Sequence, residues 1–513
     1  MTGAGTLPSY DEVPYTALPF VQSHPSRLAA MARLFGIDSP PVATASVLEL
    51  GCALGGNLIP MAVSMPNATL LGIDLSARQI EDGTRVVQTL GLGNIVLRHA
   101  DIADVNESWG RFDYIIAHGI YSWVPQPIRE KLLDICHANL APNGVAYVSY
   151  NTQPGWKLRG IARDLMLYHS RNESTPPDRM RMSREALDFL GRHLPPDTPY
   201  AAALRDILDS LSGVDDAYLS HDHLETDNNA FYFHEFVDAA RAHHLQYLGE
   251  AEFSAMAPQV PAELKDTLRK IAPDLVAREQ YLDFLHHRSF RQTLLVHADA
   301  SINRNIEPRT MGAFDFASSI QPESASFSLA QGALETLSTP AGASISTGSA
   351  LAKAALVELG QRWPLSIGFA ELLDRARFRL GPSRASTPIE QDARMLAIDM
   401  LQCYAAAVID LRTWSPAMAT SPGGRPLASA LARLQAQRGG DVTTLLHRSI
   451  LMNPVGRALL PLLDGKRNRD QLAAALSTFA DRGEIVVPIR AGGFRALVDE
   501  TLSGLGRAAL LER

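Results

Sequence analysis

The chain has 513 residues, of which 46% are hydrophobic and 20% are charged, as in ordinary globular proteins. That length predicts two to four domains. The net charge of −8 argues against a general binder of nucleic acids or anionic membranes, and three widely spaced cysteines provide neither a disulfide framework nor a metal-binding pattern.

The cysteines and the lack of export or membrane signals predict a cytoplasmic protein. An odd number of cysteines is typical of a reducing compartment. No basic and apolar signal segment opens the sequence. The apolar run from Val47 to Met65 is broken by Glu49 and Asn57, so it does not predict a membrane span.

Residues 1–40 precede the first predicted strand and are rich in turn-forming residues. We interpret them as a segment that lies over the functional site as a lid, with Tyr15, Phe20 or His24 facing a ligand. The alternative, which the sequence leaves open, is that these side chains pack against the edge of a sheet.

A nucleotide-binding βαβ pattern comes next. The apolar run Ser46–Leu50 contains an acid, Glu49, and breaks at Gly51. Gly55 then opens a predicted helix, and a second apolar run ends at Asp74. Glycines let the backbone approach a ligand closely, and an acid at the end of the second strand can accept both hydroxyls of a ribose.

The spacing of this turn resembles that of class I methyltransferases, which use S-adenosylmethionine (SAM). A dinucleotide fingerprint requires G-x-G-x-x-G, whereas Ala53 stands where the middle glycine would be. SAM has no pyrophosphate and needs no glycine-rich phosphate cradle. Ala53 also departs from the commonest methyltransferase pattern, which bears on cofactor affinity and not on the fold.

Further strands complete the predicted sheet. Residues 94–98, 112–117 and 144–150 read as strands, and residues 128–140 have helical spacing. In such sheets ligands bind beyond the carboxyl ends of the strands, where the strand order reverses. Six residues fall at or near such ends: Glu49, Gly51, Asp74, Asp101, His118 and Asn151.

The same resemblance implies how SAM would be held. Asp74 would bind the ribose, and Asp101 would lie at the adenine. The alternatives are a helix N-cap for Asp74, an Asx turn for Asp101 and tight helix–sheet packing for Gly55. The methionine part would lie among Glu49, Gly51, Gly55 and the backbone of His118 and Gly119.

Motifs on both sides of the turn narrow the resemblance. Together they resemble bacterial methyltransferases with a methyltransferase regulatory domain, a group that includes the rickettsial protein lysine methyltransferases (PKMTs). The similarity reaches to about residue 297. The motifs are Tyr15, Pro19-Phe20, Ser23–Pro25, Leu48–Cys52, Gly55–Met61, Gly119–Pro125, Asn151–Trp156, Phe231–Phe236, His244–Gly249, Gln280–Phe284 and Phe290–Leu294.

Residues 157–297 are predicted to form the regulatory region. Within it, Leu245–Glu250 and Arg291–His297 read as strands, and we expect them to complete the catalytic sheet. Residues 157–228 and 254–290 would then be helical insertions above the site.

Aromatic residues on the predicted active face favour an amine acceptor. A lysine must first lose its proton, which costs about 4.6 kcal/mol for a pKa near 10.4 at pH 7, and a desolvating aromatic channel lowers that pKa. Tyr121, Trp123, Tyr150 and Trp156 lie on this face, although the tryptophans could instead wedge inserted helices against the core. We expect Tyr121 and Asn151 to contact the acceptor.

Two other chemistries are less favoured. An oxygen acceptor would require a base such as His118, but methyltransferases usually use backbone contacts at that position. The pairs His221–His223 and His243–His244 lack a supporting ligand pattern, so no metal cofactor is expected.

The C-terminal third divides into a linker, residues 298–349, and a mainly helical domain, residues 350–513. From residue 317 the linker is rich in Ser, Ala, Gly and Thr. The domain resembles the winged-helix-like C-terminal domain of the same family. Its predicted helix at 368–379 mixes acidic with basic residues, so protein recognition or dimer packing is favoured over DNA binding.

These features predict an α/β protein: a Rossmann-like class I methyltransferase sheet in residues 41–156 with helical insertions, and a winged-helix-like C-terminal domain. The predicted function is SAM-dependent methyl transfer to a protein lysine or another amine. The alternatives are a small-molecule N- or O-methyltransferase, and a SAM-binding regulator or scaffold without catalysis.

Overall fold

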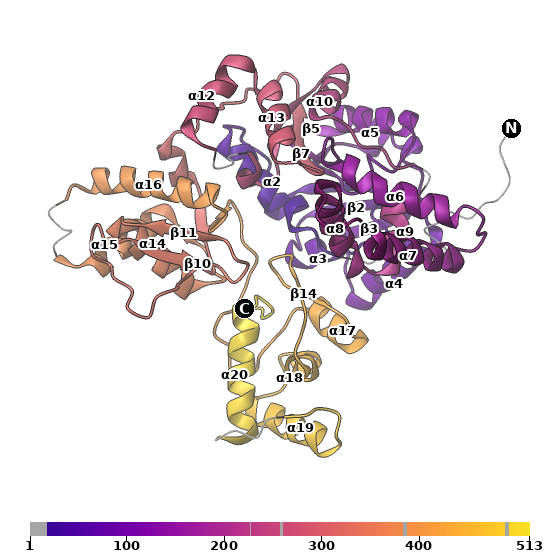
Figure 1. Ribbon diagram of the computed structural model, residues 1–513. Coiled ribbons are helices and arrows are strands. Elements are labelled where there is room, and N and C mark those ends of the chain that lie inside the picture. The colour runs from indigo at the N-terminus through magenta and orange to yellow at the C-terminus, as the bar shows by residue number, and fades with distance from the viewer. Residues whose placement is uncertain (1–17, 226, 257–259, 383–386, 488–491) are drawn as a thin grey trace.

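The computed structural model describes residues 18–513 apart from 226, 257–259, 383–386 and 488–491. Tyr15, one of the predicted lid residues, lies outside the described residues. The main body is built around a seven-stranded sheet with helices on both faces, and a smaller C-terminal unit projects from this body (Figure 1).

The sheet has the strand order β3-β2-β1-β4-β5-β7-β6. The first five strands of that order are parallel, and β7 runs antiparallel to both β5 and β6. The order reverses between β1 and β4, where such sheets bind ligands. The predicted fold class is confirmed. The strands are β1 (Ser46–Leu50), β2 (Thr69–Asp74), β3 (Ile95–His99), β4 (Phe112–Ala117), β5 (Leu140–Asn151), β6 (Leu245–Glu250) and β7 (Phe290–His297).

Alternate residues of the central strands build two cores, one on each face of the sheet. Val47 belongs to a core with α2 and α3, whereas Leu48 and Leu50 belong to a core with α5 and α10. Successive side chains of a strand point to opposite faces, so Glu49 lies on the same face as Val47. The helices are α2 (Pro25–Leu34), α3 (Leu58–Ser64), α4 (Ala77–Leu90), α5 (Gln126–Ala138) and α10 (Phe233–Ala242).

The region after β5 completes the sheet, which confirms the predicted pairing. β7 pairs with β5 from Ala146↔Leu295 to Asn151↔Phe290, and β6 pairs with β7. Helices α6 to α9 share a small core of their own. The inserted helices are α6 (Trp156–Ser170), α7 (Pro176–His193), α8 (Pro199–Ser212), α9 (Asp216–His223), α11 (Phe253–Met256), α12 (Ala262–Ile271) and α13 (Leu275–Leu285).

The stretch interpreted as a linker with short ordered pieces holds a three-stranded sheet, β9 to β11, and contributes β8 to a second small sheet. β8 lies between β12 and β13 and pairs with both, and it is too short to leave a periodic signal in the sequence. The core of this middle unit is continuous with that of the main sheet. Its elements are β8 (Asp315–Ala317), β9 (Gln321–Pro322), β10 (Glu335–Ser338), β11 (Ser344–Thr347), α14 (Ala350–Arg362), β12 (Ile367–Gly368), α15 (Phe369–Leu380), α16 (Ile389–Ala405) and β13 (Asp410–Arg412).

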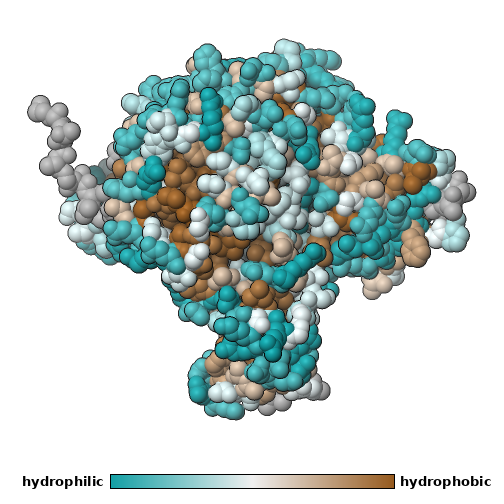
Figure 2. Space-filling view, turned by 180° about the vertical axis from the view of Figure 1, so that it is seen from behind, coloured by the Kyte–Doolittle hydropathy of each residue, from teal (hydrophilic) through white to brown (hydrophobic). Residues whose placement is uncertain are grey.

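The last unit has a separate core, made of residues between 428 and 511. Residues 350–513, interpreted as one domain, therefore form two packing units. From behind, apolar surface gathers on the body, whereas the projecting unit is largely hydrophilic (Figure 2). Its elements are α17 (Ala430–Arg438), β14 (Val442–Thr443), β15 (Ser449–Ile450), α18 (Pro454–Leu459), α19 (Arg469–Asp481) and α20 (Gly493–Arg507).

Candidate cofactor site

The turn after β1 carries a left-handed backbone at the carboxyl end of the sheet. Gly51 has a φ of +71°, a left-handed conformation in which a larger residue would be strained, and a Cβ at this residue would lie 2.2 Å from Cδ1 of Ile120, which would have to move. Ala53 also has a positive φ, of +50°. The turn thus keeps a left-handed conformation at the position where the sequence departs from the common pattern. Gly55, with a φ of +80°, packs closely against Leu97 of β3.

Asp74 ties this turn to the start of helix α4. Its Oδ2 accepts the backbone N–H of Ala53 at 2.8 Å, and its Oδ1 accepts that of Ser76 at 2.9 Å. Ser76 accepts the N–H of Gln79 and is therefore the N-cap, a role that the sequence had left open for Asp74. The two bonds orient the Asp74 carboxylate at the carboxyl end of β2, where the ribose of SAM is expected.

Glu49 is a buried carboxyl group beside the turn, with 3% of its surface exposed. Its Oε1 accepts a bond from Nδ2 of Asn57 at 2.7 Å, whereas its Oε2 has no hydrogen-bond partner among the described residues. Burial raises the pKa of Glu49 to about 8, and the nearby Asp74 acts in the same direction. A buried carboxylate oxygen is costly without a donor or a cation, so Oε2 fits the cationic methionine end of SAM.

Glu49→Gln is expected to flatten the pH dependence of stability in the cofactor-free protein. Because the pKa of Glu49 rises from 4.5 to about 8, the folded state keeps a proton that the unfolded chain loses. This contribution is complete below about pH 4.5 and is lost as the pH rises towards 8. Urea unfolding at about pH 5 and pH 8 should show a smaller loss in Glu49→Gln than in the wild type. Equal losses, or the same flattening in a Glu107→Gln control at an exposed site, would contradict this role of the buried carboxyl.

The segment before α2 lies against the carboxyl end of β4. Phe20 stacks on His118 with ring centroids 3.7 Å apart. Burial lowers the pKa of His118 to about 4, and its Nδ1 lies 2.9 Å from the hydroxyl of Tyr147. The imidazole is therefore neutral and a poor general base near neutral pH, which argues against the oxygen-acceptor alternative. Closure of this segment as a lid stays a prediction.

Asp101 lies at the same edge of the sheet as Asp74. Its Oδ1 accepts the N–H of Ala103 at 2.8 Å, which is the Asx turn that the sequence had left as the alternative. The strand register places His99 of β3 beside Asp74 of β2, two residues before Asp101. The contact of Asp101 with the adenine stays a prediction.

Tyr121, predicted to contact the acceptor, lies in a buried aromatic cluster. It is 4% exposed and meets Tyr150, Phe231 and Phe236 edge to face, with ring centroids 5.1 to 6.0 Å apart. Burial raises the pKa of Tyr121 to about 12. The phenol therefore stays neutral and is no base at neutral pH.

Asn151, the other predicted acceptor contact, ends β5 and bonds the loop after β4 and the segment between α9 and α10. Its N–H donates to Oγ of Ser122 at 2.8 Å, and its Nδ2 lies 3.4 Å from Oδ1 of Asn228. Trp156 stacks on His223 with the planes 6° apart. That packing joins two inserted helices, α6 and α9, and a role of Trp156 as a wedge against the core stays a prediction.

Two polar residues of the site received no role from the sequence patterns. Asn57 binds Glu49; in the sequence it is a polar residue that interrupts an apolar run, and it lies within the family motif Gly55–Met61. Ser149 accepts the N–H of Gly119 at 2.8 Å and so fixes the backbone at this residue. The contact of the backbone of His118 and Gly119 with the methionine amino group stays a prediction.

The two histidine pairs, His221–His223 and His243–His244, are the remaining candidate metal ligands from the sequence. Within the described ranges, no three His, Cys, Asp or Glu side chains are placed to hold a metal ion. His243 instead lies between two carboxylates: its Nε2 is 2.6 Å from Oε2 of Glu130, and its Nδ1 is 2.7 Å from Oδ1 of Asp134.

None of the helices in the described part of the chain has both the length and the apolar character that a bilayer span requires.

Three family models match this chain. A methyltransferase domain matches residues 47–144, a predicted methyltransferase regulatory domain matches residues 215–297, and a PKMT C-terminal winged helix domain matches residues 424–509. Their order is the order in which the sheet, the region that completes it and the projecting unit occur in the structure.

Rickettsial proteins are similar over nearly the whole chain. An uncharacterised protein of Rickettsia prowazekii is 36% identical over 500 residues, which are 95% of this chain and 89% of that protein. A second protein of that organism is 39% identical over 45% of this chain and 94% of its own length. The structure of PKMT2 from Rickettsia typhi in complex with AdoHcy is 31% identical, with a TM-score of 0.87 over 97% of this chain and 100% of that one.

Proposed function

Because the chain belongs to the family of the rickettsial PKMTs, we propose that it methylates the side-chain amine of a lysine in a protein. It is a SAM-dependent methyltransferase by this membership, and the lysine acceptor is the proposed part. The observation that carries the proposal is the correspondence with PKMT2 over 97% of this chain, which includes the projecting C-terminal unit.

The site supports SAM as the methyl donor. SAM, when bound, supplies an electrophilic methyl group on a sulfonium centre. In this proposal the unpartnered Oε2 of Glu49 faces the cationic methionine end. Asp74 holds the ribose, and Asp101 lies at the adenine. The turn residues Gly51 and Gly55 and the backbone of His118 line the methionine part.

The acceptor amine is aligned and desolvated by the protein. Alignment of nucleophile and methyl contributes up to about 7–11 kcal/mol in ideal cases. In this proposal the aromatic cluster around Tyr121 desolvates the lysine side chain placed against it, which lowers the pKa of that lysine. Attraction of the ammonium form by the rings acts on this pKa in the opposite direction and contributes to acceptor binding instead. Because Tyr121 and His118 are neutral and weakly basic here, neither takes up the proton of the acceptor. The lysine whose pKa is lowered by desolvation releases its proton to solvent before the methyl transfer.

Asn151→Ala is expected to lower kcat/KM for the protein acceptor about 10- to 100-fold, because the amide of Asn151 orients the acceptor and the loop that carries Asn228. The affinity for SAM should change less than about twofold. Steady-state kinetics and calorimetry separate the two effects. Asn143→Ala, at an exposed position of β5, is the control and should match the wild type. A loss of SAM affinity as large as the loss of kcat/KM would contradict the acceptor role.

The proposed acceptor class is tested with methyl-labelled SAM and a cell lysate. Wild-type enzyme should transfer label to material that a protease degrades, and Asp74→Ala should transfer almost none. Label in protease-resistant small molecules would support a small-molecule methyltransferase instead. Tight SAM binding without any labelled product would support the regulator or scaffold.

The C-terminal domain has two proposed roles: recognition of the protein acceptor, and packing between two copies of the chain. Sedimentation at several concentrations distinguishes them. A monomer that still methylates protein supports recognition, whereas a dimer that loses activity on dissociation supports packing.

A further inference from the structure

Asn57 joins three distant parts of the chain at the edge of the SAM site. It is 4% exposed and begins helix α3. Its Nδ2 donates to Oε1 of Glu49 at 2.7 Å and to Oγ of Ser23 at 3.0 Å. Its Oδ1 accepts the N–H of Phe20 at 2.9 Å and lies 2.7 Å from Nε2 of His447. The amide thus makes the four hydrogen bonds that an asparagine side chain can form.

These partners determine the proton on His447. The N–H of Phe20 can only donate, so the atom that it meets must be the amide oxygen of Asn57. His447 must then donate from Nε2 to the same oxygen. Burial lowers the pKa of His447 well below its ordinary value, and its Nδ1 has no partner in the described part of the chain. His447 is therefore a neutral imidazole that carries its proton on Nε2.

His447 is held at the tip of a hairpin in an unusual conformation. The tip connects β14 to β15, and His447 has a φ of +58°, a region that non-glycine residues rarely adopt. Although a hairpin tip is normally exposed, His447 is 2% exposed, because the tip packs on the body beside His24 with ring centroids 5.0 Å apart. Helix α17, which belongs to the projecting C-terminal unit like this hairpin, contacts α3, and β14 lies next to α3 in the ribbon view (Figure 1).

Strain of this kind persists where the surroundings over-determine it, and it clusters at functional sites. We infer that the projecting C-terminal unit supports the SAM site, with His447 as a positioning residue. Through Asn57 it holds the Glu49 carboxyl and the backbone of Phe20 in place. The inference rests on the proposed SAM site and adds a requirement to it: cofactor affinity depends on a hairpin 390 residues away from Asn57.

Calorimetry of SAM binding to hairpin variants tests whether cofactor affinity depends on His447. His447→Gly suits the left-handed backbone and removes the imidazole, so it should weaken SAM binding about 10-fold. His447→Gln, which carries an amide N–H at similar reach, should restore most of that loss. Ser449→Ala is the control in the same hairpin. The Ser449 hydroxyl is exposed and donates to Asp441, so the SAM affinity of this variant should stay within about twofold of the wild type.

A double-mutant cycle with Asn57→Ala shows whether the effect passes through Asn57. The double variant should bind SAM as Asn57→Ala alone does, because the two residues act on Glu49 as one unit. Wild-type affinity in His447→Gly would overturn the inference while leaving the proposed function intact. A full additional loss in the Asn57→Ala background, or no recovery in His447→Gln, would overturn it as well. Absence of SAM binding by the wild type would overturn both.

Discussion

Asp74→Ala is expected to weaken SAM binding by at least about 100-fold. The carboxylate holds the turn through the N–H groups of Ala53 and Ser76, and in the proposed complex it also accepts the ribose hydroxyls. Hydrogen bonds to a charged group contribute about 1.5–3 kcal/mol each, so the loss of two corresponds to two decades or more in affinity. Calorimetry of SAM with the purified variant measures this directly.

A second aspartate provides the matched control. Asp113 accepts the N–H of Ser46 at 2.8 Å, near the amino ends of β4 and β1 and thus at the opposite edge of the sheet. Asp113→Ala removes a similar carboxylate-to-backbone bond and should leave SAM affinity within about threefold of the wild type. If Asp74→Ala binds SAM as tightly as Asp113→Ala does, the assignment of Asp74 to the cofactor is wrong.

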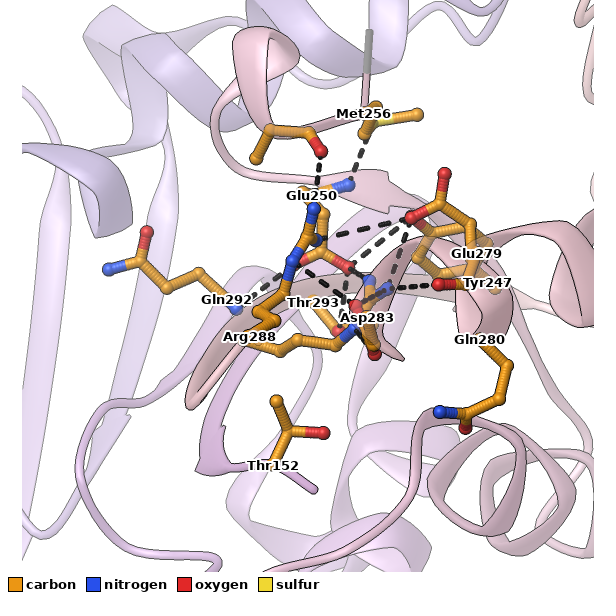
Figure 3. A network of polar contacts seen from close by, with 12 residues as sticks. Thr152, Tyr247, Glu250, Met256, Glu279, Gln280, Asp283, Arg288, Gln292 and Thr293 are labelled. Atoms are coloured by element: carbon orange, nitrogen blue, oxygen red, sulfur yellow. Dashed lines mark hydrogen bonds and ion pairs between the residues drawn. The ribbon is translucent and has the colours of Figure 1, made fainter. Parts of the chain in front are cut away.

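Arg291→Met is expected to lower the free energy of unfolding by about 3–5 kcal/mol. Arg291 is 1% exposed on β7. It donates to both oxygens of Asp283, at 2.7 and 2.9 Å, and pairs with Glu279 and Glu250. Figure 3 shows these carboxylates converging from α13 and β6, with Arg288 beside them. Removal of Arg291 would leave buried carboxyl groups without their main counter-charge.

Urea unfolding measures this effect, and an exposed ion pair is the control. Arg269 pairs with Asp266 on α12, and both side chains are more than 60% exposed. Arg269→Met should therefore change the unfolding free energy by less than about 1 kcal/mol. Similar unfolding midpoints for the two variants would show that the buried network does not hold α13 and β6 onto the sheet.

The central sheet and the turn could be predicted from the sequence because their signals are local. Glu49 and Asp74 lie within 26 consecutive residues, and the spacing of strand, glycine turn and strand places both at one edge of the sheet. The pairing of β7 with β5 and of β6 with β7 followed from two apolar runs and the family motifs around them. Ala53 departs from the common pattern, yet its N–H is the group that Asp74 binds.

Contacts between distant segments could not be predicted in the same way. The bond between Asn57 and His447 joins residues 390 positions apart, and no periodicity or spacing relates a hairpin tip to a helix start. The three residues of β8 are a strand only because β12 and β13 flank them. The Arg291 network likewise depends on the packing of α13 against β7, which a single sequence does not encode as a pattern.

Identification of the methylated atom tests the proposed lysine methylation most directly. Lysate proteins labelled by the wild-type enzyme should be digested, and the labelled peptides sequenced by tandem mass spectrometry. We expect the added methyl groups to lie on the side-chain nitrogens of lysines and to be absent when Asp74→Ala replaces the wild type. Label located on carboxylates, hydroxyls or nucleobases would contradict a protein lysine methyltransferase.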